Sequence, residues 1–259
     1  MDSNTYYLNG LNKEKIKRIV VHQPNLFPNI KVLQKICSGD LWVILDDVQF
    51  VRREWQNRCK VRHLKDSEKE FWITANISKA SQKEKINKIK FKDYNEFKKV
   101  TIQQMKHLYG KSRNWCFIEE LINKAFKNEY QLLSDFCVNS IITFLNMLNI
   151  RKTISYSSNF NINYTKTKRL VELCKIFNAT SYISGLAGKS YMDTGLFSKE
   201  NILVEWHEWQ QPCFESEDDQ LDWRNFSFID FVARYNISEV QSYLLNSKRD
   251  RINETNKIK

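Results

Sequence analysis

Residues 19–62 read IVVHQPNLFPNIKVLQKICSGDLWVILDDVQFVRREWQNRCKVR, and this stretch decides the fold. Two short apolar runs within it end in polar residues: 19–21 (IVV) lead into HQPN, and 41–45 (LWVIL) lead into DDVQ. A buried strand that stops in such side chains is typical of a parallel sheet that delivers residues to a crevice at its carboxyl edge. The stretch therefore predicts a sheet and the floor of a ligand site.

A helix is predicted between the two runs. Asn29 can cap its start and Gly39 can end it, and the apolar positions between them share one face: Ile30, Val32, Leu33 and Ile36. Strand, helix and strand in so short a stretch form a βαβ unit, so the sheet is expected to be parallel.

The whole pattern predicts an α/β fold, with a mainly parallel, Rossmann-like sheet and an inserted helical subdomain. Further strands are expected at residues 57–61, 71–77, 86–91, 151–155, 181–183 and 203–206, and further helices at 94–108, 114–126, 131–148, 168–177 and 228–235. We divide the chain into a first part of the α/β core (18–93), a helical insertion or lid (94–150), a second part of the core (151–240) and a charged tail (241–259). The tail is expected to fray from Lys248.

The composition restricts the possible functions. The formal charge of +11 favours anionic partners such as nucleotide phosphates or RNA, although lysines spread along helices more often form a solvated face. The six cysteines contain no CxxC pair, which argues against a zinc finger or a disulfide scaffold. The chain shows no signal-peptide pattern and no long apolar run, so we expect a cytoplasmic protein without a membrane span.

Several blocks of sequence carry a family resemblance. HQPNLFP, then LDDVQFVRREWQNRCKVR, and later TKTKRLVELCKIFNATSYISGLAGKSYMD follow one another as in the WbqC-like family, which this chain resembles over most of residues 19–232. The resemblance implies a bacterial cytoplasmic protein linked to the biosynthesis of O-antigen-like surface polysaccharides. It also implies the transfer of an aminoacyl or glycyl group to an amino sugar.

His22, Asp46 and Asp47 are the candidate catalytic residues. His22 follows a buried strand, so its ring is expected at the carboxyl edge of the sheet, where a pKa near neutrality suits general acid or base work. Asp46 or Asp47 can orient His22 or hold a Mg²⁺ ion with a phosphate, but adjacent residues of a strand point to opposite faces. The alternative role for the two carboxylates is a salt bridge with Arg52, Arg53 or Arg58.

Planar side chains form the first group of candidate binding residues. A guanidinium offers a two-pronged contact to a phosphate or carboxylate, and an aromatic ring can stack on a sugar or base. The group consists of Gln23, Asn25, Gln49, Arg52, Arg53, Trp55, Gln56, Asn57 and Arg58.

The second group lies in the turn SGLAGKSY, residues 184–191. Only two residues separate its glycines, so it lacks the spacing of a P-loop, but a turn of small residues after a strand still suits an anion. Its candidate residues are Ser184, Gly185, Gly188, Lys189 and Tyr191. His207, between two tryptophans, is interpreted as a packing residue, with a place in the site as the alternative.

The leading functional hypothesis is a transferase that attaches an aminoacyl or acyl group to a nucleotide-linked amino sugar. The donor can be an aminoacyl-tRNA or another carrier, and Mg²⁺ can accompany the nucleotide. A second hypothesis is an ATP-dependent, adenylate-forming amide ligase or nucleotidyltransferase-like enzyme, although the His-x-Gly-His motif is absent: positions 24 and 25 are Pro and Asn. The third is a basic, non-catalytic protein that binds RNA or a carrier.

Overall fold

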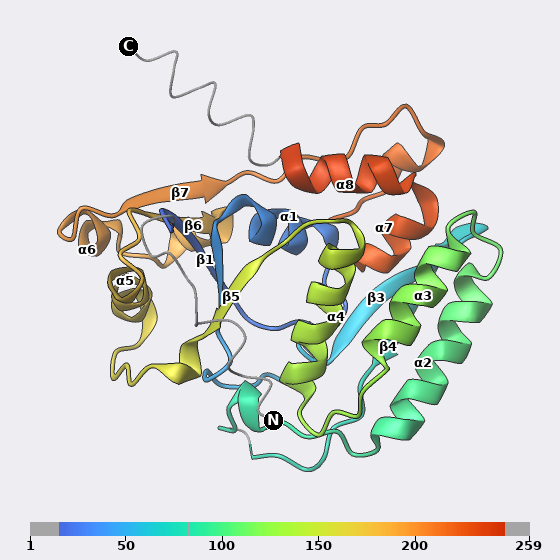
Figure 1. Cartoon of the computed structure of the whole chain (residues 1–259), viewed down its shortest axis with the longest axis horizontal. Helices are drawn as coiled ribbons and strands as arrows, with labels where there is room; N and C mark the ends of the chain where they lie inside the picture. The colour runs from blue at the N-terminus through green and yellow to red at the C-terminus, as the bar shows by residue number, and fades with distance from the viewer. Residues whose placement is uncertain (1–15, 82, 247–259) are drawn as a thin grey trace.

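A five-stranded parallel sheet forms the centre of the protein, as Figure 1 shows for a computed structural model that describes residues 16–81 and 83–246. Its strands are β1 (Arg18–His22), β2 (Leu41–Ile44), β5 (Thr153–Tyr156), β6 (Ser181–Gly185) and β7 (Leu203–His207). They lie in the order β5-β2-β1-β6-β7, and every neighbouring pair is parallel. The chain therefore has the α/β, Rossmann-like fold that the sequence predicts.

Helix α1 (Ile30–Ser38) joins β1 to β2 as expected. The side chain of Asn29 accepts a hydrogen bond of 2.9 Å from the backbone N–H of Val32, which satisfies one of the free donors at the start of the helix. The backbone at Gly39 lies so close to β1 that an added Cβ would stand 2.8 Å from the side chain of Val20. Glycine at the end of α1 thus allows β2 to pack directly beside β1.

Two hydrophobic clusters cover the two faces of the sheet. Register partners on one face, Val20, Trp42, Ile154 and Ile183, belong to the larger cluster. Ile19, Leu41 and Tyr182, one position away, belong to the smaller cluster on the other face. Helices α1, α4, α7 and α8 contribute side chains to the larger cluster, and α5 and α6 to the smaller. The sheet is therefore buried on both sides, as its apolar strands require.

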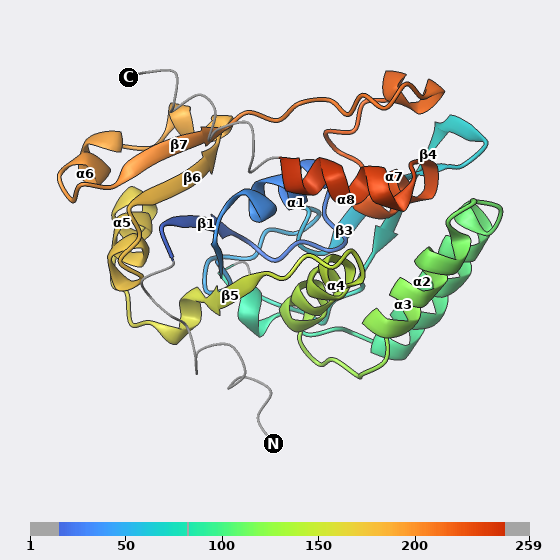
Figure 2. The ribbon, with the colours of Figure 1, turned by 45° about the horizontal axis from the view of Figure 1, so that its top comes forward.

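The segment between β2 and β5 forms a hairpin and three long helices. Strands β3 (Arg58–His63) and β4 (Asp66–Thr74) pair antiparallel in a sheet of their own. Helices α2 (Tyr94–Tyr109), α3 (Trp115–Ala125) and α4 (Leu133–Met147) follow, side by side with the hairpin in Figure 2. Their buried residues belong to the same cluster as Val20 and Trp42.

The prediction of an edge strand at residues 86–91 is wrong. Ile86–Lys88 is the short 3-10 helix η3, and only isolated bridges follow, from Lys90 to Leu132 and from Phe91 to Ile77. Ile86, Ile89 and Phe91 are all buried in the larger cluster. Their spacing of three and then two residues fits one turn of 3-10 helix followed by an extended segment.

The second half of the chain continues the α/β pattern. It contains η4 (Ser157–Asn159), α5 (Lys166–Ile176), η5 (Leu186–Ser190), α6 (Thr194–Ser198), η6 (Glu217–Gln220), α7 (Phe228–Arg234) and α8 (Ile237–Asn246). The first residues of the expected charged tail thus belong to α8, while the part from Lys248 lies outside the described residues. Within the described ranges, each helix is too short or too polar to cross a bilayer.

Candidate functional site

A cavity of about 880 Å³ opens at the carboxyl ends of β1 and β6. The chain runs from β1 to β2 on one side, and β6 lies on the other side of β1, so the cavity occupies the switch point of the sheet, where ligands of such folds bind. Its lining comes from β1, α1, the turn after β6, the end of β7 and residues 219–225. The lining residues are His22, Asn25, Asn29, Lys31, Val32, Lys35, Trp55, Gly185, Leu186, Ala187, His207, Trp209, Gln211, Asp219, Gln220, Leu221, Asp222, Arg224 and Asn225.

His22 and Lys35 form the polar centre of this cavity. The Nζ atom of Lys35 lies 3.1 Å from Nδ1 of His22. When Lys35 is an ammonium ion it only donates, so Nδ1 of His22 then accepts and Nε2 carries the ring proton. That Nε2 atom is buried and has no hydrogen-bond partner among the described residues.

Burial shifts the pKa of both groups of this pair toward their neutral forms. Burial, and then the positive charge of Lys35, hold the pKa of His22 well below its ordinary value. Burial, and then the charge of Lys31, lower the pKa of Lys35 to about 8. Lys35 is half-buried, and among the ion pairs of the described chain none gives it a carboxylate partner. His22 is therefore neutral at pH 7, which corrects the expectation of a pKa near neutrality, and Lys35 titrates near pH 8.

The HQPN and WQNR blocks are held together beside this pair. The amide of Gln56 donates a hydrogen bond of 2.7 Å to the side chain of Gln23, and its oxygen accepts one of 3.0 Å from the backbone of Val51. The backbone N–H of Leu26 donates to the carbonyl of Trp55 at 2.9 Å. Trp55 and the buried Asn25 line the cavity beside these contacts. Gln23 and Gln56 bond to each other and are not part of the cavity lining.

The turn after β6 divides its candidate residues between cavity, core and surface. Gly185 lines the cavity. Gly188 is buried, and a Cβ there would stand 2.4 Å from the hydroxyl of Ser184, so this glycine serves packing. Lys189 lies over the ring of Trp206 at 5.5 Å, and Tyr191 is exposed.

The structure places the Asp46 and Asp47 carboxylates outside the cavity lining. Asp46 accepts hydrogen bonds from both Ser157 and Ser158, the shortest being 2.7 Å from the Ser158 hydroxyl. Asp47 pairs with Arg169 on α5. The expectation that one of them orients His22 is thus corrected, because the hydrogen-bond partner of His22 is Lys35. The alternative salt bridge is corrected too: the arginine that Asp47 contacts is Arg169.

Most of the remaining planar residues also lie outside the cavity. Arg52, Arg53 and Gln49 are exposed, and Asn57 is buried with its amide donating to the carbonyl of Ala75. The guanidinium of Arg58 stacks 4.0 Å above the ring of Trp72. Among the described residues, the cluster of planar donors therefore does not converge on one anion.

Several residues that line the cavity were not predicted from the sequence. Lys31 and Lys35 lie one turn apart on α1, although lysines on helices were expected to form a solvated face. His207 and Trp209 also line the cavity, so the alternative reading of His207 is the one the geometry favours. The signal that could have found Lys35 is that the charged residues of α1, Lys31 and Lys35, lie one turn apart and therefore on the same side of the helix.

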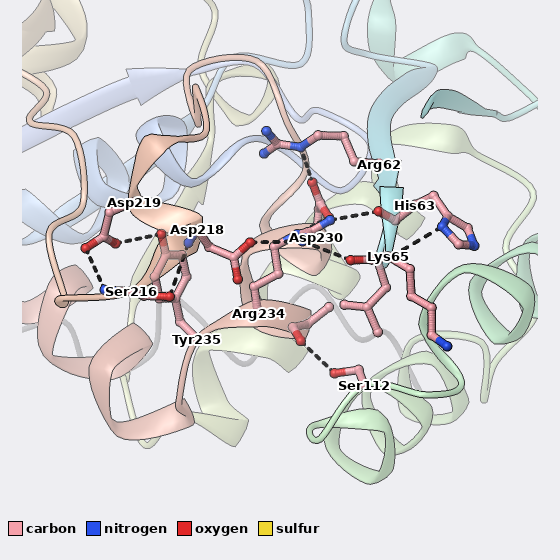
Figure 3. A network of polar contacts seen from close by, with 12 residues as sticks. Arg62, His63, Lys65, Ser112, Ser216, Asp218, Asp219, Asp230, Arg234 and Tyr235 are labelled. Atoms are coloured by element: carbon pink, nitrogen blue, oxygen red, sulfur yellow. Dashed lines mark hydrogen bonds and ion pairs between the residues drawn. The ribbon is translucent and has the colours of Figure 1, made fainter. Parts of the chain in front are cut away.

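Figure 3 shows a largely buried network of polar contacts that joins α7 to β3 and η6. Arg234 on α7 contacts Asp218 at 3.0 Å and Asp230 at 3.3 Å, and Asp230 also pairs with Arg62 on β3 at 2.8 Å. Asp219 accepts a hydrogen bond of 2.8 Å from the hydroxyl of Tyr235. These bonds fix η6, from which the lining residues 219–225 continue.

The residues present do not fit the Mg²⁺ ion expected at Asp46 and Asp47. The carboxylate of Asp46 is occupied by serine and asparagine donors, and that of Asp47 by Ser157 and Arg169. No group of three histidine, cysteine or carboxylate side chains in the described residues has the arrangement of a metal site. We therefore assign no metal to these two aspartates.

Comparisons with known proteins agree with the sequence blocks. A relative, the uncharacterized protein Rv1507c of Mycobacterium tuberculosis, is 26% identical over 199 residues, which cover 75% of this chain and 83% of the relative. No solved structure matches the chain. The model of the WbqC-like protein family matches residues 23–242, from the residue after His22 to α8, and the chain belongs to this family.

Proposed function

We propose that this protein is a cytoplasmic transferase of surface-polysaccharide biosynthesis that attaches an aminoacyl or acyl group to the amine of a nucleotide-linked amino sugar. The observation that carries the proposal is the 3.1 Å contact between His22 and Lys35 in the cavity at the switch point of the sheet. A neutral imidazole beside an amine that titrates near pH 8 suits a reaction in which an amine must lose a proton.

The chemistry of the cavity supports an anionic sugar ligand. Its volume of about 880 Å³ is within the range of sites for small molecules and cofactors. Lys31 supplies positive charge for a phosphate, and helix α1, on which it lies, has no acidic residue. Asp219 and Asp222 also line the cavity, but they are engaged with Tyr235 and Arg224. Trp55 and Trp209 offer aromatic faces to a sugar or base.

The reaction needs one proton acceptor at the amine. As the amine nitrogen attacks the acyl carbon, the bond to the donor's leaving group breaks and the nitrogen loses a proton. Near pH 8 roughly half of the Lys35 side chains are neutral, since the pKa of Lys35 is about 8. The His22–Lys35 pair therefore takes up that proton without help from Asp46 or Asp47.

Ligand binding followed by turnover tests this proposal. Purified protein is heated with UDP- or TDP-amino sugars, ATP, acyl-CoA or bulk tRNA, and a ligand at about a hundred times its Kd should add about 2.7 kcal/mol of stability. We expect a shift with a nucleotide amino sugar, its loss in Lys31→Ala with Lys35→Ala, and amide formation that disappears in His22→Ala.

The control is Lys124→Ala on α3, where the lysine pairs with Glu120 on an exposed surface outside the cavity lining. It should bind and turn over like the wild type. A shift with tRNA alone that weakens with salt would contradict the proposal and favour an RNA partner. A shift with ATP, together with its consumption, would favour an amide ligase.

A further inference from the structure

The side-chain amine of Lys35 has surroundings that suit covalent chemistry. It lies in the cavity lining against a neutral imidazole, and in the described chain it has no carboxylate to hold it as an ammonium ion. Most buried lysines are paired, because an isolated ammonium group is costly to remove from water. A lysine desolvated beside a second cation, here Lys31, is instead the arrangement that produces a nucleophilic amine.

We propose that Lys35 forms an imine with an aldehyde or ketone that carries a phosphate or carboxylate group. The carbonyl selects the amine, and the anionic group selects Lys31 at the mouth of the cavity. This reactivity goes beyond the acyl transfer proposed above and does not require it. The ligand class is that of keto sugars, open-chain sugar phosphates and keto acids.

The groups around Lys35 can complete the reaction. The Lys35 nitrogen forms a bond to the carbonyl carbon, and the proton that the nitrogen loses passes to Nδ1 of His22, 3.1 Å away. In the addition step the carbonyl oxygen takes up a proton from solvent and becomes a hydroxyl. His22 then returns its proton to this hydroxyl, which leaves as water. The second N–H proton of the amine is lost to solvent, which restores the proton that the oxygen took up. In total, one amine and one carbonyl give one imine and one water.

The reactivity of Lys35 should exceed that of the other lysines. At pH 8 an amine with a pKa of about 8 is roughly half neutral, whereas an ordinary lysine with a pKa near 10.4 is less than about 1% neutral. The fraction of reactive amine is thus on the order of a hundred-fold larger at Lys35. Lys31, exposed and one turn away on the same helix, is the internal comparison.

Reductive trapping tests the proposal on the intact protein. Pyridoxal 5′-phosphate, an aldehyde with a phosphate, is added at about equal concentration at pH 8, and sodium borohydride reduces any imine to a stable secondary amine. Mass spectrometry of the whole chain and of its peptides then counts and locates the adduct. We expect one dominant adduct, at Lys35, at least ten-fold above Lys31, and slower labelling by pyridoxal, which lacks the phosphate.

Two variants serve as controls. Lys35→Arg keeps the charge but cannot form the imine, so the dominant adduct should disappear, while Lys31→Arg should keep it. Equal labelling of Lys31 and Lys35, or an unchanged adduct in Lys35→Arg, would overturn the proposal. Trapping does not depend on turnover, so an adduct at Lys35 without amide formation would contradict only the proposed acyl transfer. Amide formation without an adduct would contradict only the proposed imine.

Discussion

The side-chain amide of Gln56 donates a hydrogen bond of 2.7 Å to the side-chain oxygen of Gln23, and this contact joins the HQPN and WQNR blocks. Gln56 is buried, with 4% of its surface exposed, and its own oxygen is taken by the backbone of Val51. Both residues were expected to bind substrate. Their geometry shows that the two blocks are bonded to each other at the residue next to Trp55, which lines the cavity.

Removing either glutamine should therefore destabilise the protein. Gln56→Leu leaves Gln23 and the backbone of Val51 unpartnered, which costs about 1–3 kcal/mol of unfolding free energy. In urea denaturation, the double variant Gln23→Leu, Gln56→Leu should lose less than the sum of the single variants. Gln103→Leu on the exposed side of α2 is the control, and strictly additive losses would show that the two glutamines do not interact.

The two glycines of the turn after β6 give a matched pair of substitutions. An added Cβ at Gly188 meets the hydroxyl of Ser184 at 2.4 Å and the ring of Trp206 at 3.1 Å, whereas one at Gly185 meets nothing within 4 Å. Gly188→Ala should thus lower the unfolding free energy by about 1–3 kcal/mol. Gly185→Ala should keep the wild-type stability but weaken ligand binding, because Gly185 lines the cavity. Thermal melts with and without a nucleotide amino sugar separate the two effects.

Local patterns were sufficient to predict the fold because its strands and helices have regular apolar spacing. The runs at β1 and β2, the Asn29 cap and the break at Gly39 lie within one βαβ unit, where each signal depends on neighbouring residues. The strand prediction for residues 86–91 failed because the burial of these residues depends on a segment distant in the sequence, the start of α4. A short apolar segment does not by itself distinguish a strand from a 3-10 turn.

The candidate site was predicted in part, and for a related reason. His22 and Gly185 could be placed because strand ends meet at the carboxyl edge of a parallel sheet. Lys35 could not, because its contact with His22 depends on how α1 turns back over β1. The roles expected of Asp46 and Asp47 differ from their contacts because two of their partners, Ser158 and Arg169, are more than a hundred residues away in the sequence.

The low pKa of His22 predicts a specific loss of stability in mild acid. Since the folded pKa lies below the ordinary value of 6.5, the unfolded chain binds the proton first as the pH falls. The stability that His22 contributes is therefore fully present above about pH 6.5 and is lost as the pH falls toward its folded pKa. Between pH 7.5 and 5.5 the loss is about 1 kcal/mol.

Urea denaturation at several pH values measures this loss. His22→Gln should show a smaller decline than the wild type, by about the contribution of one histidine. His107→Gln on α2 removes an imidazole outside the cavity lining and supplies the comparison. Parallel pH curves for the wild type and His22→Gln would show that His22 is not held neutral.

Asp230 is the centre of the buried network behind the cavity, and its removal should be the most costly of these changes. It is fully buried between Arg62, at 2.8 Å, and Arg234, at 3.3 Å. Asp230→Ala leaves both guanidinium groups without their shared partner, and breaking a buried pair in this way costs about 3–5 kcal/mol. Glu120→Ala, in the exposed pair with Lys124, should change the unfolding free energy by less than about 0.5 kcal/mol.

Because Arg234 also holds Asp218, we further expect faster amide hydrogen exchange at residues 216–225 in Asp230→Ala, at denaturant concentrations where it is still folded. Unchanged exchange there would mean that residues 216–225 are held by other contacts, such as the one between Asp219 and Tyr235.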